Sequence, residues 1–161
     1  MSKSASLQIK PAKSEDAQFV RQLVRAAYAQ WVPVIGREPL PMKADYDRAI
    51  REHDIDLLYV GGNLVALIEM IMAVDHLFIE NVAVEPVHQG KGFGRQLLSH
   101  ADRKAWKAGL PEIRLLTNAA FAANIRLYRS VGFRIDREEP FRGGTAVYMS
   151  KAIALSDLPL R

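Results

Sequence analysis

Residues 79–98 read IENVAVEPVHQGKGFGRQLL, and this stretch decides the fold. Val82–Val84 has the composition of a strand, a turn follows it, and the pattern of a long helix begins directly afterwards. Between the turn and the helix stand three alternating glycines, Gly90, Gly92 and Gly94. Without side chains there, a ligand can approach the backbone amides at the helix start, where the dipole also favours negative charge. Lys91 and Arg95 add positive charge, so we interpret this loop as a phosphate or pyrophosphate site.

Two familiar phosphate-binding motifs do not fit this loop. A P-loop needs Gly-x-x-x-x-Gly-Lys-Ser/Thr, which the sequence lacks. A dinucleotide-binding fingerprint needs a glycine where Arg95 stands, and a parallel βαβ unit at the start of the chain. The alternative of a simple tight turn accounts for one glycine, but not for three beside two cations.

Working outward, apolar spacing and turn residues predict strands over 7–10, 55–60, 64–73, 77–84, 112–117, 133–136 and 145–150. They predict helices over 14–31, 44–53, 89–110 and 121–131. The helix over 89–110 has one apolar face, formed by Leu97, Leu98, Ala101, Ala105 and Ala108. Gly61-Gly62-Asn63 predicts a tight hairpin, whereas the prolines of the apolar stretch 31–42 predict a loop. The order predicts a mixed sheet with helices on both faces.

Composition limits the class of protein. The 161 residues are the size of one domain, and 49% apolar with 25% charged residues excludes a disordered chain. The absence of cysteine excludes disulfides, thiolate metal sites and a cysteine nucleophile. We expect no membrane span, since no apolar run approaches about 18 residues. Residues 1–10 lack the apolar stretch of a secretory signal, so we expect a cytoplasmic protein.

The formal net charge of +4 is unevenly distributed. Residues 1–37 carry +4, residues 38–89 carry −7 and residues 90–161 carry +7. These charges either lie on ordinary solvated faces or divide the molecule into an anion-binding and a cation-binding part. Nucleic-acid binding is disfavoured, because Asp102 interrupts the cations of the helix over 89–110 and few aromatic residues lie among them.

Gln89–Gly94 resembles the Gln/Arg-x-x-Gly-x-Gly/Ala signature of the GNAT superfamily of acyl-CoA N-acyltransferases. The surroundings are also similar: Val82–Val84 precedes it, and Leu127-Tyr128 and Gly132-Phe133 follow further along. The similarity runs from about residue 7 to residue 153 and includes the order of elements. It implies one GNAT-like domain over 1–161 with an α+β (mixed α/β) fold. That fold has a twisted, mostly antiparallel sheet of about seven strands with a V-shaped splay, flanked by about four helices.

The resemblance implies acetyl-CoA as the acyl donor. In the family the loop amides bind its pyrophosphate, and its pantetheine arm lies beside a bulged strand, here facing residues 112–117 and pairing with Val82 and Val84. A backbone N–H near Val82 would hold the thioester oxygen. The implied cofactor-binding residues are Val82, Ala83, Val84, Gln89, Gly90, Lys91, Gly92, Phe93, Gly94, Arg95, Asn124 and Tyr128.

Tyr128 occupies the position of the family's general acid, which protonates the departing thiolate. Its alternative role is that of a packing aromatic on an amphipathic helix. Many members carry an asparagine where this chain has Phe121. Asn124, one helical turn before Tyr128, either takes over that cofactor contact or is a helix-surface amide, and Asn118 is a weaker candidate.

Glu80 is the candidate general base, because strand alternation places it on the same face as Val82 and Val84. It could equally be an exposed carboxylate or a partner of Arg114. His76 shares this face and is either a water-mediated helper or structural. No metal is expected, since the four histidines show no ligand spacing and acyl transfer from a thioester needs none.

The acceptor pocket of such proteins is built from the segment that corresponds to residues 28–54 and from a late strand loop. The substrate-binding candidates are therefore Tyr28, Trp31, Ile35, Met42, Tyr46, His76 and Phe141. The negative charge of residues 38–89 would suit a cationic amine. We expect direct acetyl transfer to a primary amine: a small molecule, an amino acid, or the N-terminus or a lysine of a peptide. The alternative is a catalytically silent CoA-binding sensor or interaction module. Many members form dimers, so a homodimer is the oligomeric state that analogy suggests.

Overall fold

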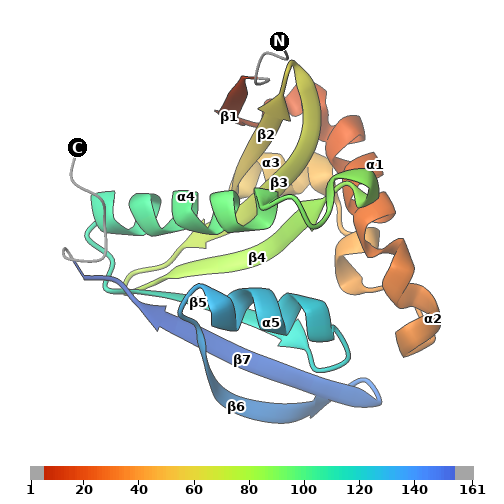
Figure 1. Ribbon diagram of the computed structural model, residues 1–161, viewed down its shortest axis with the longest axis vertical. Helices are drawn as coiled ribbons and strands as arrows, with labels where there is room; N and C mark the ends of the chain where they lie inside the picture. The colour runs from red at the N-terminus through yellow and green to blue at the C-terminus, as the bar shows by residue number, and fades with distance from the viewer. Residues whose placement is uncertain (1–5, 155–161) are drawn as a thin grey trace. The chain divides into compact units, whose positions relative to one another are not determined.

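The structure, a computed structural model, describes residues 6–154 (Figure 1). These residues form strands β1 (Leu7–Pro11), β2 (Asp54–Val60), β3 (Asn63–Met72), β4 (Leu77–Val84), β5 (Glu112–Asn118), β6 (Arg134–Phe141) and β7 (Gly144–Ala152). They also form helices α1 (Ala17–Tyr28), α2 (Val32–Ile35), α3 (Tyr46–Glu52), α4 (Phe93–Lys107) and α5 (Ala122–Ser130). Short 3-10 turns lie at Ser14–Asp16, Ala29–Trp31, Leu40–Lys43 and Pro86–His88.

The strands form one sheet in the order β1-β2-β3-β4-β5-β7-β6. β1 pairs antiparallel with β2, and β7 pairs antiparallel with both β5 and β6. β4 and β5 pair in parallel, with Leu77–Ile79 beside Ile113–Leu115. The predicted mixed, mostly antiparallel sheet of seven strands is confirmed.

The chain forms two compact units, one of residues 1–69 and 81–94 and the other of residues 70–80 and 95–161. β3, β4 and α4 each continue from one unit into the other. The single domain over 1–161 stays a prediction, and residues 1–5 and 155–161 of it lie outside the described residues.

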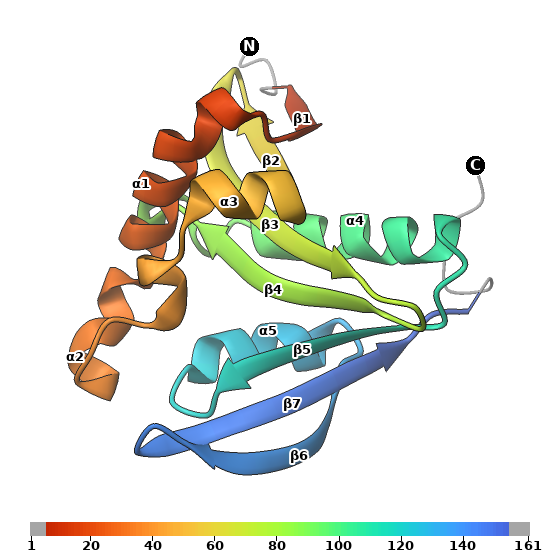
Figure 2. The same cartoon turned by 180° about the vertical axis from the view of Figure 1, so that it is seen from behind.

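The first unit has a core between α1, α3 and the β2–β3 hairpin. α3 lies behind β2 and β3 in Figure 1 and in front of them in Figure 2, so it covers one face of the hairpin. The helical spacing of α1 buries one side of that helix, at Val20, Leu23 and Val24. The strands contribute the buried aliphatic side chains Leu57, Leu58, Leu67 and Ile68. This packing fixes α1 and α3 against the strands.

The second unit contains most of α4 and all of α5. The predicted apolar face of α4 is buried at Leu97, Leu98, Ala101 and Ala105. Ala108 is exposed, contrary to the prediction, because α4 ends at Lys107. α5 covers β5 and β7, lying in front of them in Figure 1 and behind them in Figure 2.

The edge strand β6 is exposed along its whole length. It carries alternating charges, and the pairs Arg134–Asp136 and Arg137–Glu139 lie 3.0 and 2.9 Å apart. Arg137 also stacks over the ring of Tyr148 on β7, 3.8 Å from the ring centroid. Charges and Pro140 discourage pairing with a further strand, so this edge is protected although it is long.

Three predictions about the elements were wrong. The strand predicted over 133–136 is much longer, because β6 runs from Arg134 to Phe141. Residues 31–42 are not a continuous loop, because α2 and the turn Leu40–Lys43 lie within them, each with a proline in its first turn, where proline is tolerated. The helix predicted over 89–110 begins only at Phe93. The hairpin prediction was correct: Gly61 and Gly62 both have positive φ, as its tight turn requires.

Lys151 of β7 and Asp102 of α4 form the most enclosed Arg or Lys ion pair described in the second unit. Nζ lies 2.7 Å from Oδ2, both side chains are only 17% exposed, and the other carboxylate oxygen, Oδ1, is buried with no described partner. We predict that Lys151→Met lowers the free energy of unfolding by about 2 kcal/mol, because it leaves a largely buried carboxylate unpaired. Urea unfolding measures this change.

Two matched variants test the reason for that loss. Lys107→Met removes an exposed lysine from the same helix and should cost little. The double variant Asp102→Leu/Lys151→Met should recover most of the stability, since no buried charge is left without a partner. A double variant as unstable as Lys151→Met alone would show that packing, not charge, causes the loss.

Candidate functional site

The glycine-rich loop turns the chain from β4 into α4. Gly90 and Gly92 have φ values of +80° and +88°, a backbone conformation that residues with a Cβ rarely adopt. This left-handed backbone is the reason that α4 begins at Phe93 and not at Gln89. Alternating left-handed residues turn successive N–H groups toward one side, which is the geometry of an anion-binding nest.

Lys91 and Gln89 differ in their surroundings: Lys91 faces solvent, whereas the Gln89 side chain contacts β4. Lys91 is exposed, and no Cβ built at Gly90 or Gly92 meets another atom within 4 Å, so the space beside the loop is open. Gln89 folds back, its Nε2 donating to the Val84 carbonyl at 3.0 Å, and Gln30 donates to its Oε1 at 3.4 Å. Gln89 therefore fixes the loop on the end of β4.

Arg95 belongs to the second unit and is held there by α5. Its guanidinium donates to Ser130 Oγ at 2.9 Å, and that hydroxyl donates to the Leu127 carbonyl at 2.6 Å. The contact connects the first turn of α4 to the last turn of α5. A positive charge is thereby fixed one residue after the glycines.

β4 has two distinct faces. Leu77, Ile79, Asn81 and Ala83 are buried, whereas Phe78, Glu80, Val82 and Val84 are partly or fully exposed. The predicted common face of Glu80, Val82 and Val84 is therefore present. His76 precedes them with the same parity and is half-buried.

β4 also contains an irregularity. Ala73 N–H donates to the His76 carbonyl, while Glu85 N–H donates to the Val65 carbonyl. A regular antiparallel register that pairs residue 73 with 76 would pair residue 65 with 84. β4 therefore has one extra residue in this stretch, which is a β-bulge.

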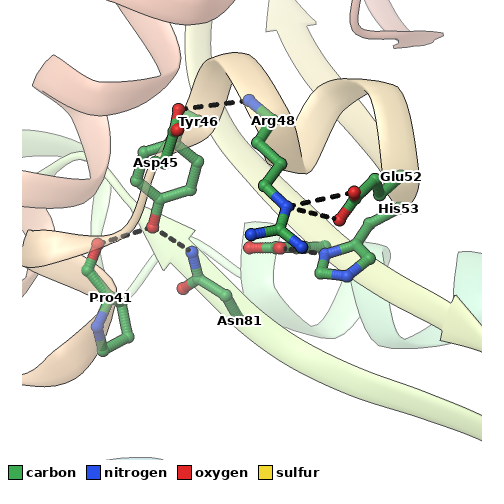
Figure 3. Close-up of polar contacts among 8 residues, drawn as sticks. Pro41, Asp45, Tyr46, Arg48, Glu52, His53 and Asn81 are labelled. Atoms are coloured by element: carbon green, nitrogen blue, oxygen red, sulfur yellow. Dashed lines mark hydrogen bonds and ion pairs between the residues drawn. The ribbon is translucent and has the colours of Figure 1, made fainter.

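A buried hydrogen-bond network, which the sequence reasoning missed, lies beside that strand. Asn81 is 3% exposed, and its Oδ1 accepts a hydrogen bond from the Tyr28 hydroxyl at 2.7 Å. Its Nδ2 donates to the Tyr46 hydroxyl at 3.4 Å, and that hydroxyl donates to the Pro41 carbonyl at 2.6 Å (Figure 3). The Tyr28 hydroxyl also lies 3.4 Å from the Val82 carbonyl oxygen. The available signal was a polar residue at a buried position of an otherwise apolar strand face.

Two of the candidate acceptor-site residues belong to this network. Tyr28 is 8% exposed and Tyr46 is 0% exposed, so both side chains lie inside the first unit. Met42 is also buried, whereas Trp31 and Ile35 are half-buried. Among these candidates, Trp31 and Ile35 present more surface to a solute.

Tyr128 lies on α5 in the second unit, buried against Phe133. The two rings meet edge to face with centroids 5.8 Å apart. Burial raises the pKa of the Tyr128 hydroxyl to about 12. It therefore stays protonated at all physiological pH values, as a hydrogen-bond donor must.

The residues before Tyr128 shape the start of α5. Asn118 Oδ1 accepts a hydrogen bond from Ala120 N–H at 2.9 Å, so its side chain closes the turn. Phe121 is buried and is the first flanking residue of the helix. Asn124 is half-buried on the same helix as Tyr128.

A cluster of charged groups surrounds the start of β4 and β5. Asp75 Oδ1 lies 2.8 Å from His76 Nδ1, and its other oxygen lies 3.7 Å from Arg114. The hydrogen bond to His76, together with Arg114, lowers the pKa of Asp75. Arg114 is also paired with Glu112, and Glu80 is exposed on the partly exposed face of β4.

The acidic segment 38–89 carries much of its charge in pairs. Arg25 pairs with Glu38 at 2.7 Å, Arg21 with Asp47 at 3.2 Å and Arg48 with Glu52 at 3.0 Å. Buried Glu69 contacts His53 Nδ1 at 2.6 Å. Surface arginines thus neutralise part of the charge that suggested a cationic acceptor.

The remaining candidates are more peripheral. Phe141 is 39% exposed at the tip of the β6–β7 hairpin, beside Arg142. His88 is half-buried beside Phe93, and its Nε2 lies 3.7 Å from Glu85. Within residues 6–154, no group of three or more His, Asp or Glu side chains could hold a metal ion. In the same part of the chain, no helix is both long and apolar enough to span a membrane.

Together, the mixed sheet, the bulged strand and the left-handed glycine loop before α4 define an α+β protein with a glycine loop between a strand and a long helix. Residues 19–133 match the model of the acetyltransferase (GNAT) family. This match covers more than half of the chain, so the chain belongs to the GNAT acetyltransferase family. The predicted family is confirmed.

Relatives support this assignment. The chain is 36% identical over 73 residues to the [ribosomal protein bS18]-alanine N-acetyltransferase of Escherichia coli K12, covering 45% of this chain and 49% of the relative. It is 40% identical over 60 residues to the L-methionine sulfoximine/L-methionine sulfone acetyltransferase of Salmonella typhimurium LT2, covering 37% and 35%. The alignments thus span about half, or less, of these relatives.

A solved structure shares the fold. The PaiA N-acetyltransferase of Thermoplasma acidophilum, solved in complex with coenzyme A, matches with a TM-score of 0.79 and 19% identity. The match covers 91% of this chain and 99% of that protein. The predicted GNAT-like fold is confirmed.

The buried Tyr128 hydroxyl generates a prediction about alkaline pH. Its pKa rises from 10.0 to about 12 on folding, so the folded protein holds this proton more tightly than the unfolded chain does. The resulting stabilisation is present below pH 10 and is lost as the pH rises from 10 to 12, by up to about 2–3 kcal/mol. Urea unfolding at several pH values should show a steeper loss in the wild type than in Tyr128→Phe. Equal slopes in the two proteins would contradict the burial of this hydroxyl.

Proposed function

We propose that this protein is an N-acetyltransferase that moves the acetyl group of acetyl-CoA directly to a primary amine. The observation that carries this proposal is the left-handed loop of Gly90 and Gly92 before α4, in a chain of the GNAT family. The loop has alternating left-handed glycines, open space beside it and two cations in its sequence, which suits a diphosphate. The names of the relatives, which include an alanine N-acetyltransferase of a ribosomal protein, support an amine acceptor.

The loop and β4 would hold the acyl donor. Backbone amides of residues 90–95 would bind the diphosphate, with Lys91 as a further positive charge. Val82 and Val84, on the partly exposed face of the bulged strand, would offer backbone groups to the pantetheine arm. A backbone N–H near Val82 would hold the thioester oxygen as negative charge develops on it.

Two side chains would handle protons. When bound, acetyl-CoA supplies an activated acyl group, so a neutral amine can form the new C–N bond as the C–S bond breaks. Glu80 would accept the proton that the amine must lose, either directly or through water. Tyr128 would donate a hydrogen bond to the departing sulfur. Because its pKa of about 12 exceeds that of a thiol in water, about 8.5, full proton transfer requires that the sulfur is desolvated as well.

The proposed acceptor is a primary amine, and its pocket is proposed from the more accessible candidates. Trp31 and Ile35 would form apolar walls of the acceptor pocket, and Phe141 and His76 remain candidates. Because arginines neutralise several acids of residues 38–89, we propose a primary amine without requiring a second positive charge on it.

The first experiment measures thiol release from acetyl-CoA against a panel of amines, amino acids and peptides. We predict that the wild type shows amine-dependent release and that Tyr128→Phe lowers kcat about 100-fold, while the KM for acetyl-CoA changes less than threefold, because the hydroxyl acts on charge that develops during the reaction. Tyr59→Phe, which alters a tyrosine of β2, is the control. Coenzyme A binding without turnover on any amine would favour the silent sensor module.

The second experiment tests the loop by calorimetry with coenzyme A. We predict that Gly92→Val weakens binding at least tenfold, because valine cannot readily adopt φ of +88° and would turn the amides away from the diphosphate. Gly109→Val is the matched control, since Gly109 also has positive φ (+71°) and open space around it but follows the end of α4. Equal losses in both variants would mean that general strain, not the loop, sets the affinity.

A further inference from the structure

The Asn81 network is a buried polar feature that the proposed chemistry leaves unused. Asn81 stands between the candidate base Glu80 and the candidate oxyanion residue Val82. Its side chain points to the opposite face of β4, into the core of the first unit, where it is 3% exposed. A buried amide is costly unless its hydrogen bonds are satisfied, so its partners indicate what it does.

Those partners come from three separate segments. Tyr28 is the last residue of α1, Tyr46 is the first residue of α3, and Pro41 lies in the turn Leu40–Lys43. Each tyrosine has one proton to donate, which fixes the direction of the network: Tyr28 donates to Asn81, Asn81 donates to Tyr46, and Tyr46 donates to Pro41. Rotating the Asn81 amide by half a turn would bring Oδ1 against the Tyr46 hydroxyl, whose proton already goes to Pro41, and would break that hydrogen bond. The network therefore allows one orientation of Asn81.

The network also reaches the backbone of β4. Asn81 is itself part of this strand and is bonded directly to Val82, so fixing its side chain restrains the neighbouring peptide. The Tyr28 hydroxyl, whose single proton goes to Asn81 at 2.7 Å, lies 3.4 Å from the Val82 carbonyl oxygen. The ladder on β3 carries one extra residue between His76 and Glu85, so regular pairing is interrupted within this stretch. Side chains from two helices add a further constraint on the strand, through Asn81.

We propose that Tyr28 and Tyr46 are positioning residues, which act through Asn81 to fix the peptide groups at Val82 that hold the acyl oxygen. The effect on catalysis rests on the proposed function, whereas the ordering of the peptide groups at Val82 does not depend on it. Oxyanion donors need accurate placement, within about 0.5 Å, because they stabilise charge that appears only in the transition state. The role replaces the expectation that these two tyrosines contact the acceptor.

The structural part is tested by amide hydrogen exchange, followed by mass spectrometry of a peptide that covers residues 81–84. Tyr28→Phe and Tyr46→Phe should each increase exchange in this peptide about tenfold, with little change in peptides from α4. Tyr59→Phe, which removes a hydroxyl from β2 in the same unit, should leave it unchanged. Unchanged exchange in both network variants overturns the proposal, whether or not the protein is an acetyltransferase.

The chemical part is tested by thiol release at a temperature where circular dichroism shows all variants folded. Each network variant should lower kcat about tenfold, with less than a threefold change in the KM for acetyl-CoA, because the loop still binds the donor. The double variant should lose no more than about the larger single loss, since both hydroxyls act through Asn81. Losses confined to the KM for the amine would instead support direct acceptor contact and overturn the positioning role. A wild type that does not turn over refutes the proposed function, and the exchange result then decides this inference alone.

Discussion

The side chains of β4 alternate between two environments, and the candidate site depends on this alternation. One face buries Leu77, Ile79, Asn81 and Ala83, while the other leaves Glu80, Val82 and Val84 accessible. The buried face anchors the strand through apolar packing and one hydrogen-bonded amide. The strand is therefore held in place by its buried face, and the side chains of the other face are not needed to anchor it. A strand built in this way can present both a carboxylate and backbone groups to a ligand.

The glycine loop extends the same constraint into α4. Gln89 donates to the Val84 carbonyl, so the loop is fixed to the end of the strand. Left-handed Gly90 and Gly92 then turn the chain before the helix begins at Phe93. Because the space beside both glycines is open, their conformation serves no local packing contact. The requirement for glycine therefore lies in the backbone conformation, which alternates in the way that an anion-binding nest needs.

Much of the fold could be predicted from periodicity and turn chemistry. β4 was predicted with its observed bounds, because it alternates regularly and is bounded by turn residues. The start of α4 was predicted too early, at Gln89. Left-handed Gly90 and Gly92 cannot belong to a right-handed helix, and their conformation could not be seen in the sequence. The prediction of a loop over 31–42 was wrong. Proline breaks a helix when it lies in the interior, but it is tolerated in the first turn, where Pro33 lies in α2.

The site was less predictable than the fold, for a physical reason. Motifs report residues that touch a ligand, and Gln89–Arg95 was found in this way. Asn81, Tyr28 and Tyr46 act on one another across 35 and 53 residues of sequence, and no local pattern records such partnerships. Charge was misleading for the same reason: the excess of acid in residues 38–89 is partly cancelled by arginines, two of which lie earlier in the chain. Net charge along a sequence therefore predicts the field of a surface only after ion pairing is known.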